Sequence, residues 1–498
     1  MLLEEKRKKI QDELDSQKKS KERNQLGQFS TPYNLALEIM KYVRKCINRE
    51  SVSFIEPSIG MVAFYSAFNQ VFKKNKDKVL GFEIDEHYYI PAKEFWKGFP
   101  ITLKKADFLT QKPKNKFDLL VANPPYVRHH HIHSEKKQKL QEIVFQETGV
   151  KLSGLAGLYC YFLMISTKWL KKGGLSCWLI PSEFMDVNYG EGVKKYLLQE
   201  VDLLQIHRFR ADDLQFDDAL VTSCIVVFRN NKPTKKHDVL FTIGNSINNP
   251  QKETRYSCDD LHPEIKWTGL FENAELQVNN DTTLGDFFDV KRGIATGKNS
   301  FFIIDKKVIE EYCIPQEFLF PILPGPRFVR GNRISKDLSE SLVKKELFLF
   351  SCDLSEDVLK KRFPKLWKYI QKGIKMQANT GYICQHRTPW YNCEIRKPAS
   401  FIVPYMGRSG SNNEIFRFIL NETDAIVTNG YLMLYPKQKY MKKMNQENVR
   451  LAVWEKLNSI SKEIIERKGR FYGGGLQKIE PKELLNIPAD SIKSLLVD

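Results

Sequence analysis

The sequence predicts an α/β fold with a mostly parallel sheet, followed by a second, basic domain of mixed α+β character. Between residues 25 and 230, short apolar runs rich in β-branched and aromatic residues alternate with segments of helix length. A polar break follows at residues 230–234. Beyond the break, clusters of lysine and arginine are interleaved with phenylalanines in a mixed pattern.

Composition narrows the class of protein before any motif is considered. A chain of 498 residues with 42% hydrophobic residues can bury roughly two to four domain cores. Its 78 Lys and Arg against 60 Asp and Glu give a net charge of +18, which favours a polyanionic partner, with nucleic acid ahead of an anionic membrane. The longest apolar run, residues 158–170, is shorter than a membrane span and contains Lys168.

The chain opens with charged residues where a signal peptide needs an apolar segment, so we expect a cytoplasmic protein. Its nine cysteines include no Cys-x-x-Cys pair, which favours reduced thiols over a disulfide framework or a zinc site.

Three segments are expected along the chain. Residues 1–24 are charge-dense and predict a solvated helix anchored by Leu3, Ile10 and Leu14. Residues 25–232 form the α/β body, and residues 233–498 form the basic domain. The strands of the body are expected near Phe54 and at residues 79–82, 117–122, 175–180, 203–206 and 223–228.

Four groups of residues follow the apolar runs, at the carboxyl ends where an open parallel sheet binds its ligands. They are Glu56-Pro57-Ser58-Ile59-Gly60, Glu83-Ile84-Asp85, Asp107-Phe108 and Asn123-Pro124-Pro125-Tyr126. An acid after a strand is often only a helix cap. Four such groups in this order indicate one binding and catalytic site.

This series resembles the adenine-N6 DNA methyltransferases of the gamma arrangement, which include the TaqI-like and Eco57I-type modification methylases. The size and layout also resemble the PstI and BsuBI type. The resemblance covers nearly the whole chain and implies a Rossmann-like S-adenosylmethionine-dependent methyltransferase sheet with a C-terminal target recognition domain. It further implies that double-stranded DNA is the substrate and that a cognate restriction endonuclease shares the target sequence.

The family resemblance assigns roles to individual positions. Residues 27–32, which include Thr31, resemble the motif that closes over the methionine end of the cofactor. Glu56, with Pro57 and Gly60, matches the motif near the cofactor's amino acid moiety, and Glu83 matches the acid that binds the ribose hydroxyls. Asp107 and Phe108 match the pair that holds and stacks on the cofactor adenine. The expected cofactor-binding set is completed by Asn123.

The Asn-Pro-Pro-Tyr group suits methyl transfer to an exocyclic adenine amine, whose lone pair is delocalised into the ring. The Asn123 side-chain oxygen and the Pro124 carbonyl can accept the two amine hydrogens and stabilise the charge that develops. The rigid φ angles of Pro124 and Pro125 hold that carbonyl in place. Tyr126 offers a stacking face, and Phe216 is a second candidate for clamping an adenine flipped out of the duplex. No cysteine lies beside this group, which argues against attack on a cytosine ring carbon.

Three further sequence features concern the cofactor, the DNA backbone and the target recognition domain. Val62 stands where the family's motif usually has a second glycine, so its Cβ is expected to crowd the cofactor or to oppose a positive-φ turn. His129, His130, His131 and His133 are expected in a polar loop near the DNA backbone, since adjacent histidines point in different directions, and no metal is required. Residues 284–297 and 473–476 resemble recognition-domain signatures of the family.

Two other functions remain open from sequence. A protein-glutamine or ribosomal RNA methyltransferase would also use Asn-Pro-Pro-Tyr, because the group suits any planar amide or amine. A catalytically silent DNA-binding specificity protein is compatible with Val62. The order of motifs and the long basic extension favour a site-specific adenine methyltransferase of a restriction-modification system.

Overall fold

The computed structural model of the chain describes residues 2–210, 222–234, 237–272, 282–335, 346–408, 416–461, 464–465, 468–472 and 476–497. The chain forms two compact units. Unit 1 contains Met1–Gln277 with Tyr472–Gly474, and unit 2 contains Val278–Phe471 with Gly475–Asp498. Phe216 and residues 473–475 lie outside the described residues.

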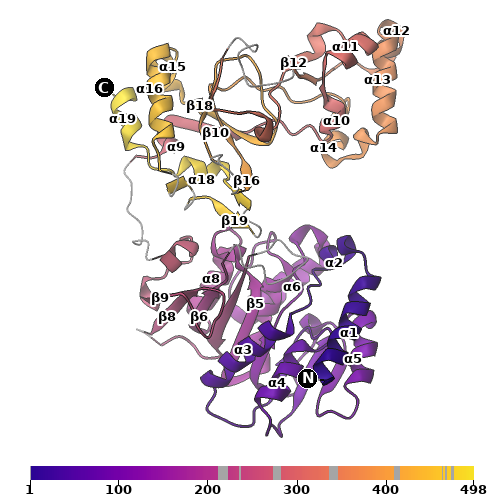
Figure 1. Ribbon diagram of the computed structural model, residues 1–498, viewed down its shortest axis with the longest axis vertical. Coiled ribbons are helices and arrows are strands. Elements are labelled where there is room, and N and C mark those ends of the chain that lie inside the picture. Colours follow the sequence, from indigo (N-terminus) through magenta and orange to yellow (C-terminus); the bar gives the residue numbers. More distant parts are fainter. Residues whose placement is uncertain are drawn as a thin grey trace. The chain divides into compact units, whose positions relative to one another are not determined.

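Unit 1 is built on one nine-stranded sheet with the order β3-β2-β1-β4-β5-β7-β6-β8-β9 (Figure 1). Its strands are β1 (Phe54–Glu56), β2 (Val79–Glu83), β3 (Thr102–Lys105), β4 (Phe117–Ala122), β5 (Leu170–Pro181), β6 (Asp202–Arg208), β7 (Ser223–Arg229), β8 (Asp238–Ile243) and β9 (Lys252–Ser257).

Strands β3, β2, β1, β4 and β5 are parallel to one another, and β7 runs antiparallel between β5 and β6. The predicted strand runs are confirmed, and with them the Rossmann-like α/β class. Strand order reverses at β1, which pairs with β2 on one side and β4 on the other. Ligands bind beyond the carboxyl ends at such a reversal, so the groups after β1, β2 and β4 are brought together.

Helices pack around this sheet and bury a continuous core. Phe54, Ile55, Leu119 and Val121 are fully buried on the central strands, which explains their near-continuous apolar sequences. The α-helices of unit 1 are α1 (Leu2–Gln17), α2 (Ser20–Leu26), α3 (Tyr33–Cys46), α4 (Ala63–Val71), α5 (Glu86–Phe95), α6 (Ser134–Thr148), α7 (Leu158–Ile165) and α8 (Gly190–Gln199).

The predicted domain boundary at residue 233 lies inside unit 1. The polar residues 230–234 form a turn between β7 and β8, and the Asn230 amide donates to the carbonyls of Thr167, Leu170 and Lys171. Strand β8 then pairs in parallel with β6, and β9 pairs with β8, so the sheet continues past the predicted break. A polar cluster marks a turn as readily as it marks a linker.

The prediction of a solvated N-terminal helix is wrong for one face of α1. Arg7, Gln11 and Leu14 are buried, while Leu3 is 38% exposed. Helix α1 lies beside α5 (Figure 1), and the Leu14 carbonyl is 3.0 Å from Nε2 of His87 on α5. The charged helix is therefore an integral part of unit 1.

Unit 2 is a mixed α+β assembly, as predicted. Its described strands form a five-stranded sheet, β10-β18-β15-β17-β13, and two three-stranded sheets, β11-β14-β12 and β16-β20-β19. The bounds of these strands are β10 (Phe288–Arg292), β11 (Ile303–Ile304), β12 (Leu319–Pro321), β13 (Arg333–Ile334), β14 (Phe348–Phe350), β15 (Phe401–Pro404), β16 (Met406–Arg408), β17 (Ile419–Asn421), β18 (Tyr431–Pro436), β19 (Arg470–Tyr472) and β20 (Leu476–Lys478).

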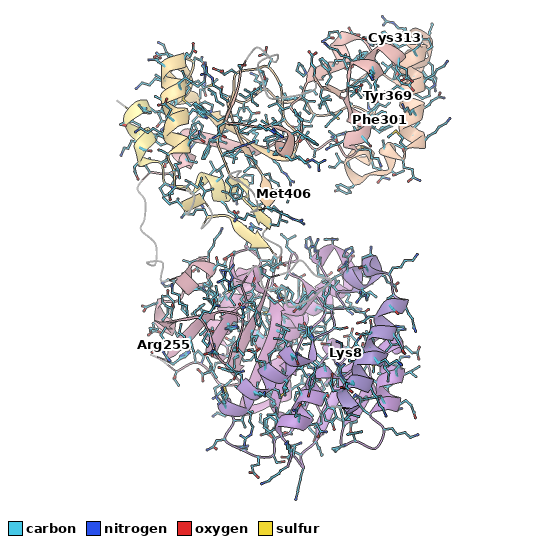
Figure 2. All side chains as sticks on the ribbon, viewed as in Figure 1. Lys8, Arg255, Phe301, Cys313, Tyr369 and Met406 are labelled. Atoms are coloured by element: carbon cyan, nitrogen blue, oxygen red, sulfur yellow. The ribbon has the colours of Figure 1, made fainter. Side chains whose placement is uncertain are left out.

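The core of unit 2 is rich in aromatic contacts. The rings of Phe301 and Tyr369, both labelled in Figure 2, stack with centroids 4.8 Å apart. The α-helices of this unit include α9 (Leu284–Phe287), α10 (Asn299–Phe302), α11 (Lys306–Tyr312), α12 (Glu356–Arg362), α13 (Pro364–Lys375), α14 (Tyr382–Gln385), α15 (Met441–Met444), α16 (Glu447–Asn458), α18 (Pro481–Leu485) and α19 (Asp490–Leu496). Across the described parts of both units, no helix combines the length and apolar character needed to cross a membrane.

Candidate functional site

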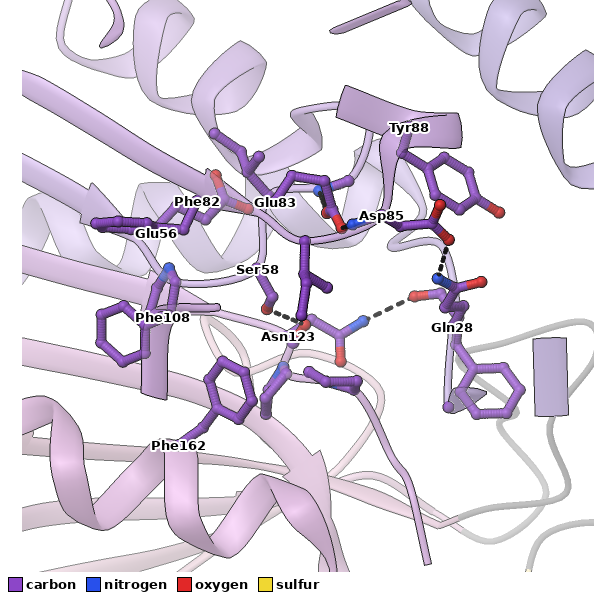
Figure 3. Close-up of a pocket in the computed structure, with 18 of the residues that line it drawn as sticks. Gln28, Glu56, Ser58, Phe82, Glu83, Asp85, Tyr88, Phe108, Asn123 and Phe162 are labelled. Carbon is purple, nitrogen blue, oxygen red and sulfur yellow. Dashed lines mark hydrogen bonds between the residues drawn. The ribbon is translucent and has the colours of Figure 1, made fainter. Parts of the chain in front are cut away.

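A cavity of about 410 Å³ opens at the carboxyl ends of β1, β2 and β4 (Figure 3). All four sequence groups contribute to its lining, with Glu56 at the end of β1, Glu83 at the end of β2, Asp107 after β3 and Asn123 after β4. Residues 26–31, a segment that includes Thr31, also line the cavity. This size is that of a pocket for a small organic molecule.

The carboxylate of Glu83 is held in a fixed orientation by two backbone amides. Its Oε2 accepts a hydrogen bond from Gly60 N at 2.9 Å, and its Oε1 accepts one from Asp85 N at 2.8 Å. Gly60 has a φ of 50°, a conformation that favours glycine. Burial raises the pKa of Glu83, while the backbone hydrogen bonds act in the opposite direction. Each carboxylate oxygen retains a second lone pair for a ligand hydroxyl.

Glu56 is a buried acid with one unsatisfied oxygen. Its side chain is 2% exposed, and Oε2 has no hydrogen-bond partner among the described residues. Burial raises the pKa of Glu56 well above its usual range, and the nearby Glu83 raises it further. The Arg7 guanidinium of α1 opposes this effect, and its Nη1 donates to the Met61 carbonyl at 3.3 Å. Glu56 thus offers an acceptor to a cationic or hydrogen-bond-donating group in the cavity.

Asp107 and Phe108 form the start of a short 3-10 turn at the cavity wall. Asp107 caps this turn by accepting from Leu109 N at 3.1 Å, and its other oxygen accepts from Lys136 Nζ at 2.8 Å. The Phe108 ring lies parallel to that of Phe162, with centroids 5.7 Å apart and an interplanar angle of 11°. Both rings line the cavity and provide apolar walls for a planar ligand.

Asn123 lines the cavity, and its side-chain amide is held at the nitrogen end. Its Nδ2 donates to the Phe29 carbonyl and to Thr31 Oγ1, both at 3.0 Å. A carbonyl can only accept, so these partners fix which end of the amide is nitrogen. The opposite atom, Oδ1, is buried and has no partner among the described residues. Ser58 Oγ donates to the Asn123 backbone carbonyl at 3.0 Å and steadies the turn (Figure 3).

The next residues of the turn have different surroundings. Pro124 and Pro125 line the cavity, whereas Tyr126 is absent from its lining. Tyr126 is 8% exposed, and its hydroxyl donates to the Leu179 carbonyl at 3.1 Å. Its ring lies 5.7 Å from that of Phe29, centroid to centroid. A stacking role for Tyr126 stays a prediction, as does that of Phe216, which lies outside the described residues.

Val62 adopts the positive-φ conformation that its Cβ was expected to oppose. Its φ is 72° and its ψ is 37°, immediately before α4. The side chain is fully buried and is not among the residues that line the cavity. The valine therefore strains the backbone, but its side chain packs into the core instead of crowding the cavity.

The histidine-rich loop forms a 3-10 turn at His129–His131, after the Asn-Pro-Pro-Tyr group, and His130 and His131 are exposed. The described residues contain no cluster of three His, Cys, Asp or Glu side chains arranged to hold a metal ion.

Gln11 on α1, Tyr88 on α5 and Phe162 on α7 also line the cavity and were not predicted from sequence. Ile84 and Asp85 belong to the predicted group after β2 and line the cavity, but the sequence assigned them no role of their own. The Asp85 side chain caps α5 by accepting from His87 N. Burial opposes ionisation of Asp85, but hydrogen bonds from Lys18 and Gln28 outweigh it and hold its pKa below the usual range.

Comparison with known proteins gives the family. The sequence model described as the Eco57I restriction-modification methylase matches residues 34–216, and that of the Type II methyltransferase M.Eco57I C-terminal domain matches residues 270–496. The Type II methyltransferase M.AccI of Acinetobacter calcoaceticus is 31% identical over 93% of this chain and 85% of its own. The chain belongs to the Eco57I family of restriction-modification methylases.

Two further comparisons show lower sequence identity to this methylase. The Type II methyltransferase M.XamI of Xanthomonas campestris pv. amaranthicola is 27% identical over 75% of this chain and 68% of its own. Among solved structures, the Type IIL restriction-modification enzyme MmeI in complex with DNA covers 98% of this chain and 73% of its own, with a TM-score of 0.56 and 12% identity. At this level of sequence identity, the likeness to MmeI shows a shared fold and says nothing of the DNA sequence that the present methylase recognises.

Proposed function

We propose that this protein is a site-specific DNA adenine-N6 methyltransferase that uses S-adenosylmethionine. The observation that carries the proposal is the Asn123 side chain, whose amide nitrogen is bound to Phe29 and Thr31 while its oxygen is buried without a partner. An unpaired buried acceptor is unfavourable unless a ligand donates to it. An exocyclic amine, which carries two N–H donors, fits this requirement.

The chemistry of adenine explains why an acceptor is needed at this point. The lone pair of the N6 amine is conjugated with the ring, and it becomes nucleophilic only as the nitrogen turns pyramidal. Acceptors on its hydrogens, the Asn123 oxygen and the Pro124 carbonyl, stabilise the positive charge that grows on the nitrogen during attack. Because the amide of Asn123 is already fixed, little reorganisation is required in the transition state.

The residues of the cavity fit S-adenosylmethionine, which would supply an electrophilic methyl group. Glu56 provides a buried, unsatisfied oxygen suited to a cationic amino group. Glu83, oriented by two backbone amides, is suited to vicinal ribose hydroxyls. Phe108, with the 59% exposed Ile84, provides apolar surfaces for a purine.

Unit 2 is proposed to bind double-stranded DNA and to choose the target sequence. Its surface combines exposed basic and aromatic side chains, such as Arg327, whose guanidinium carbon lies 4.5 Å from the ring centroid of the 55% exposed Phe328. Arginines contact phosphates and base edges, and aromatic rings stack on bases. The target adenine must leave the duplex to reach Asn123, with Phe216 proposed as part of its clamp. A cognate restriction endonuclease is the expected partner in the cell.

Expression in a methylation-deficient bacterium, followed by modification-sensitive sequencing of its DNA, tests this function. We expect N6-methyladenine at one recurring sequence with the natural chain and with the control Asn34→Ala, which alters an exposed asparagine. The Asn123→Ala variant should give none, although it should bind the cofactor with nearly normal affinity. Methylated cytosine, unmodified DNA from the natural chain, or full methylation by Asn123→Ala would each contradict the proposal.

A further inference from the structure

The N-terminal helix contributes to the cavity although it lies outside the match to the family. That match begins at residue 34, after α1 and α2. Gln11 of α1 and Leu26 of α2 nevertheless line the cavity.

The carboxylate of Asp15 on α1 accepts hydrogen bonds from three residues that line the cavity. Its Oδ1 accepts from Tyr88 Oη at 2.8 Å and from Gln11 Nε2 at 3.1 Å. Its Oδ2 accepts from Ser30 Oγ at 2.7 Å. Gln11, Ser30 and Tyr88 all line the cavity, and they come from α1, the loop before α3, and α5.

The contact with Ser30 reaches the proposed catalytic amide. Ser30 lies between Phe29 and Thr31, the two residues that accept hydrogen bonds from Asn123 Nδ2. The Asp15 side chain is 16% exposed, so water competes little for its oxygens. Restraining Ser30 therefore restrains the short segment that orients Asn123.

A second contact ties the same segment to the loop after β2. Lys18 Nζ donates to Gln28 Oε1 at 3.0 Å and also pairs with Asp85. Gln28 Nε2 donates to Asp85 Oδ2 at 2.7 Å, as the dashed line in Figure 3 marks. Asp85 is adjacent to the exposed Ile84 and close in sequence to Glu83. Asp15 on α1 and Lys18, which follows the end of α1, thus contact both the cofactor side and the catalytic side of the cavity.

We infer that Asp15 is a positioning residue for the methyl transfer, which acts through Tyr88 and Gln11 on the cofactor wall and through Ser30 on Asn123. The inference rests on the proposed function. An ionised carboxylate is suited to this place because it accepts on both oxygens and all three partners donate.

The test compares Asp15→Ala with the matched control Asp12→Ala, which alters an exposed acid on the same helix. Methylation of unmethylated plasmid DNA is measured at a temperature where circular dichroism shows each variant folded. We expect Asp15→Ala to raise the KM for S-adenosylmethionine about tenfold or more, the effect of losing one charge-assisted hydrogen bond, and to lower kcat as well. Asp12→Ala should stay within about twofold of the natural chain. A merely structural role would lower the melting temperature and leave KM and kcat of the folded protein unchanged.

Two results separate this inference from the proposed function. If the natural chain does not bind S-adenosylhomocysteine in calorimetry, the proposed function fails and the role of Asp15 fails with it. If the natural chain binds and methylates, but Asp15→Ala keeps its KM and kcat, only the inference is overturned. Should Asp15→Ala not fold, Asp15→Asn decides, since it keeps the shape and removes the charge. At least a fivefold rise in the cofactor KM is then expected, and an unchanged KM overturns the inference.

Discussion

Val62 offers a direct test of backbone strain in the loop between β1 and α4. A β-branched residue at a φ of 72° is in the left-handed region, which costs an L-residue about 1–2 kcal/mol relative to glycine. The side chain is also fully buried. Replacement of Val62 by alanine removes buried side-chain atoms but keeps a Cβ at the positive φ. Replacement by glycine removes the Cβ as well and with it the backbone strain.

The loss of buried surface and the relief of backbone strain set the stabilities expected for Val62→Ala and Val62→Gly. Val62→Ala removes two buried methyl groups, which lowers the free energy of unfolding by about 2–3 kcal/mol once the residual cavity is included. Val62→Gly removes one more carbon, about 0.8 kcal/mol, and adds about 0.5–1 kcal/mol of chain entropy. At an ordinary φ, glycine would thus be worse than alanine by roughly 1.5 kcal/mol. Here the relief of strain offsets this difference, and the two variants should be equally stable to within about 0.5 kcal/mol.

Urea denaturation followed by far-UV circular dichroism measures the difference. Val43, fully buried inside α3, is the control site, where glycine should be less stable than alanine by about 1.5–2 kcal/mol. The Val62 pair should lack this gap. A gap at Val62 as large as that at Val43 would refute the claim that the valine strains the loop.

Three other predictions concern the site. Burial raises the pKa of Glu56, so a cationic cofactor should bind more tightly as pH rises through that pKa, and its binding should release protons from Glu56. Calorimetry in two buffers of different ionisation enthalpy measures the proton release. The same dependence of affinity on pH in Glu56→Gln would contradict this prediction. Glu83→Ala should weaken cofactor binding by about 1–3 kcal/mol in the same assay, and an unchanged affinity would show that Glu83 does not bind the cofactor. Phe216→Ala should slow methylation without affecting cofactor affinity, whereas Phe216→Trp should keep substantial activity; equal rates for Phe216→Ala and the natural chain would make Phe216 a loop residue only.

Much of the fold was accessible from sequence because buried parallel strands have continuous apolar runs. The runs at residues 79–82 and 117–122 correspond to β2 and β4, and the polar residues that follow them line one cavity. Strand β3 was missed, since Thr102–Lys105 is short, largely exposed and carries two lysines. Edge strands of this kind do not show the apolar pattern on which the prediction depends.

The buried face of α1 was missed for a different reason. Its residues Arg7, Gln11 and Leu14 follow the helical spacing, but only Leu14 is apolar. A polar face is buried here because Glu4, Met61 and Asp15 satisfy it by hydrogen bonds. Hydrophobic periodicity detects helix faces buried through apolar side chains, and it does not detect faces whose buried side chains are polar and hydrogen-bonded.

The extension of the sheet by β8 and β9 determines where this chain can be cut for exchange of target specificity between relatives. A chimera joined at residue 233 would take β8 and β9 from the relative, so that Val239 and Phe241 would be exchanged in the core while β6 stays. A replacement strand that does not fit β6 would leave the edge of β6 open to pairing with another molecule. A chimera that keeps the chain through Gln277, where the N-terminal part of unit 1 ends, retains the complete nine-stranded sheet and should remain soluble while its recognition unit is replaced.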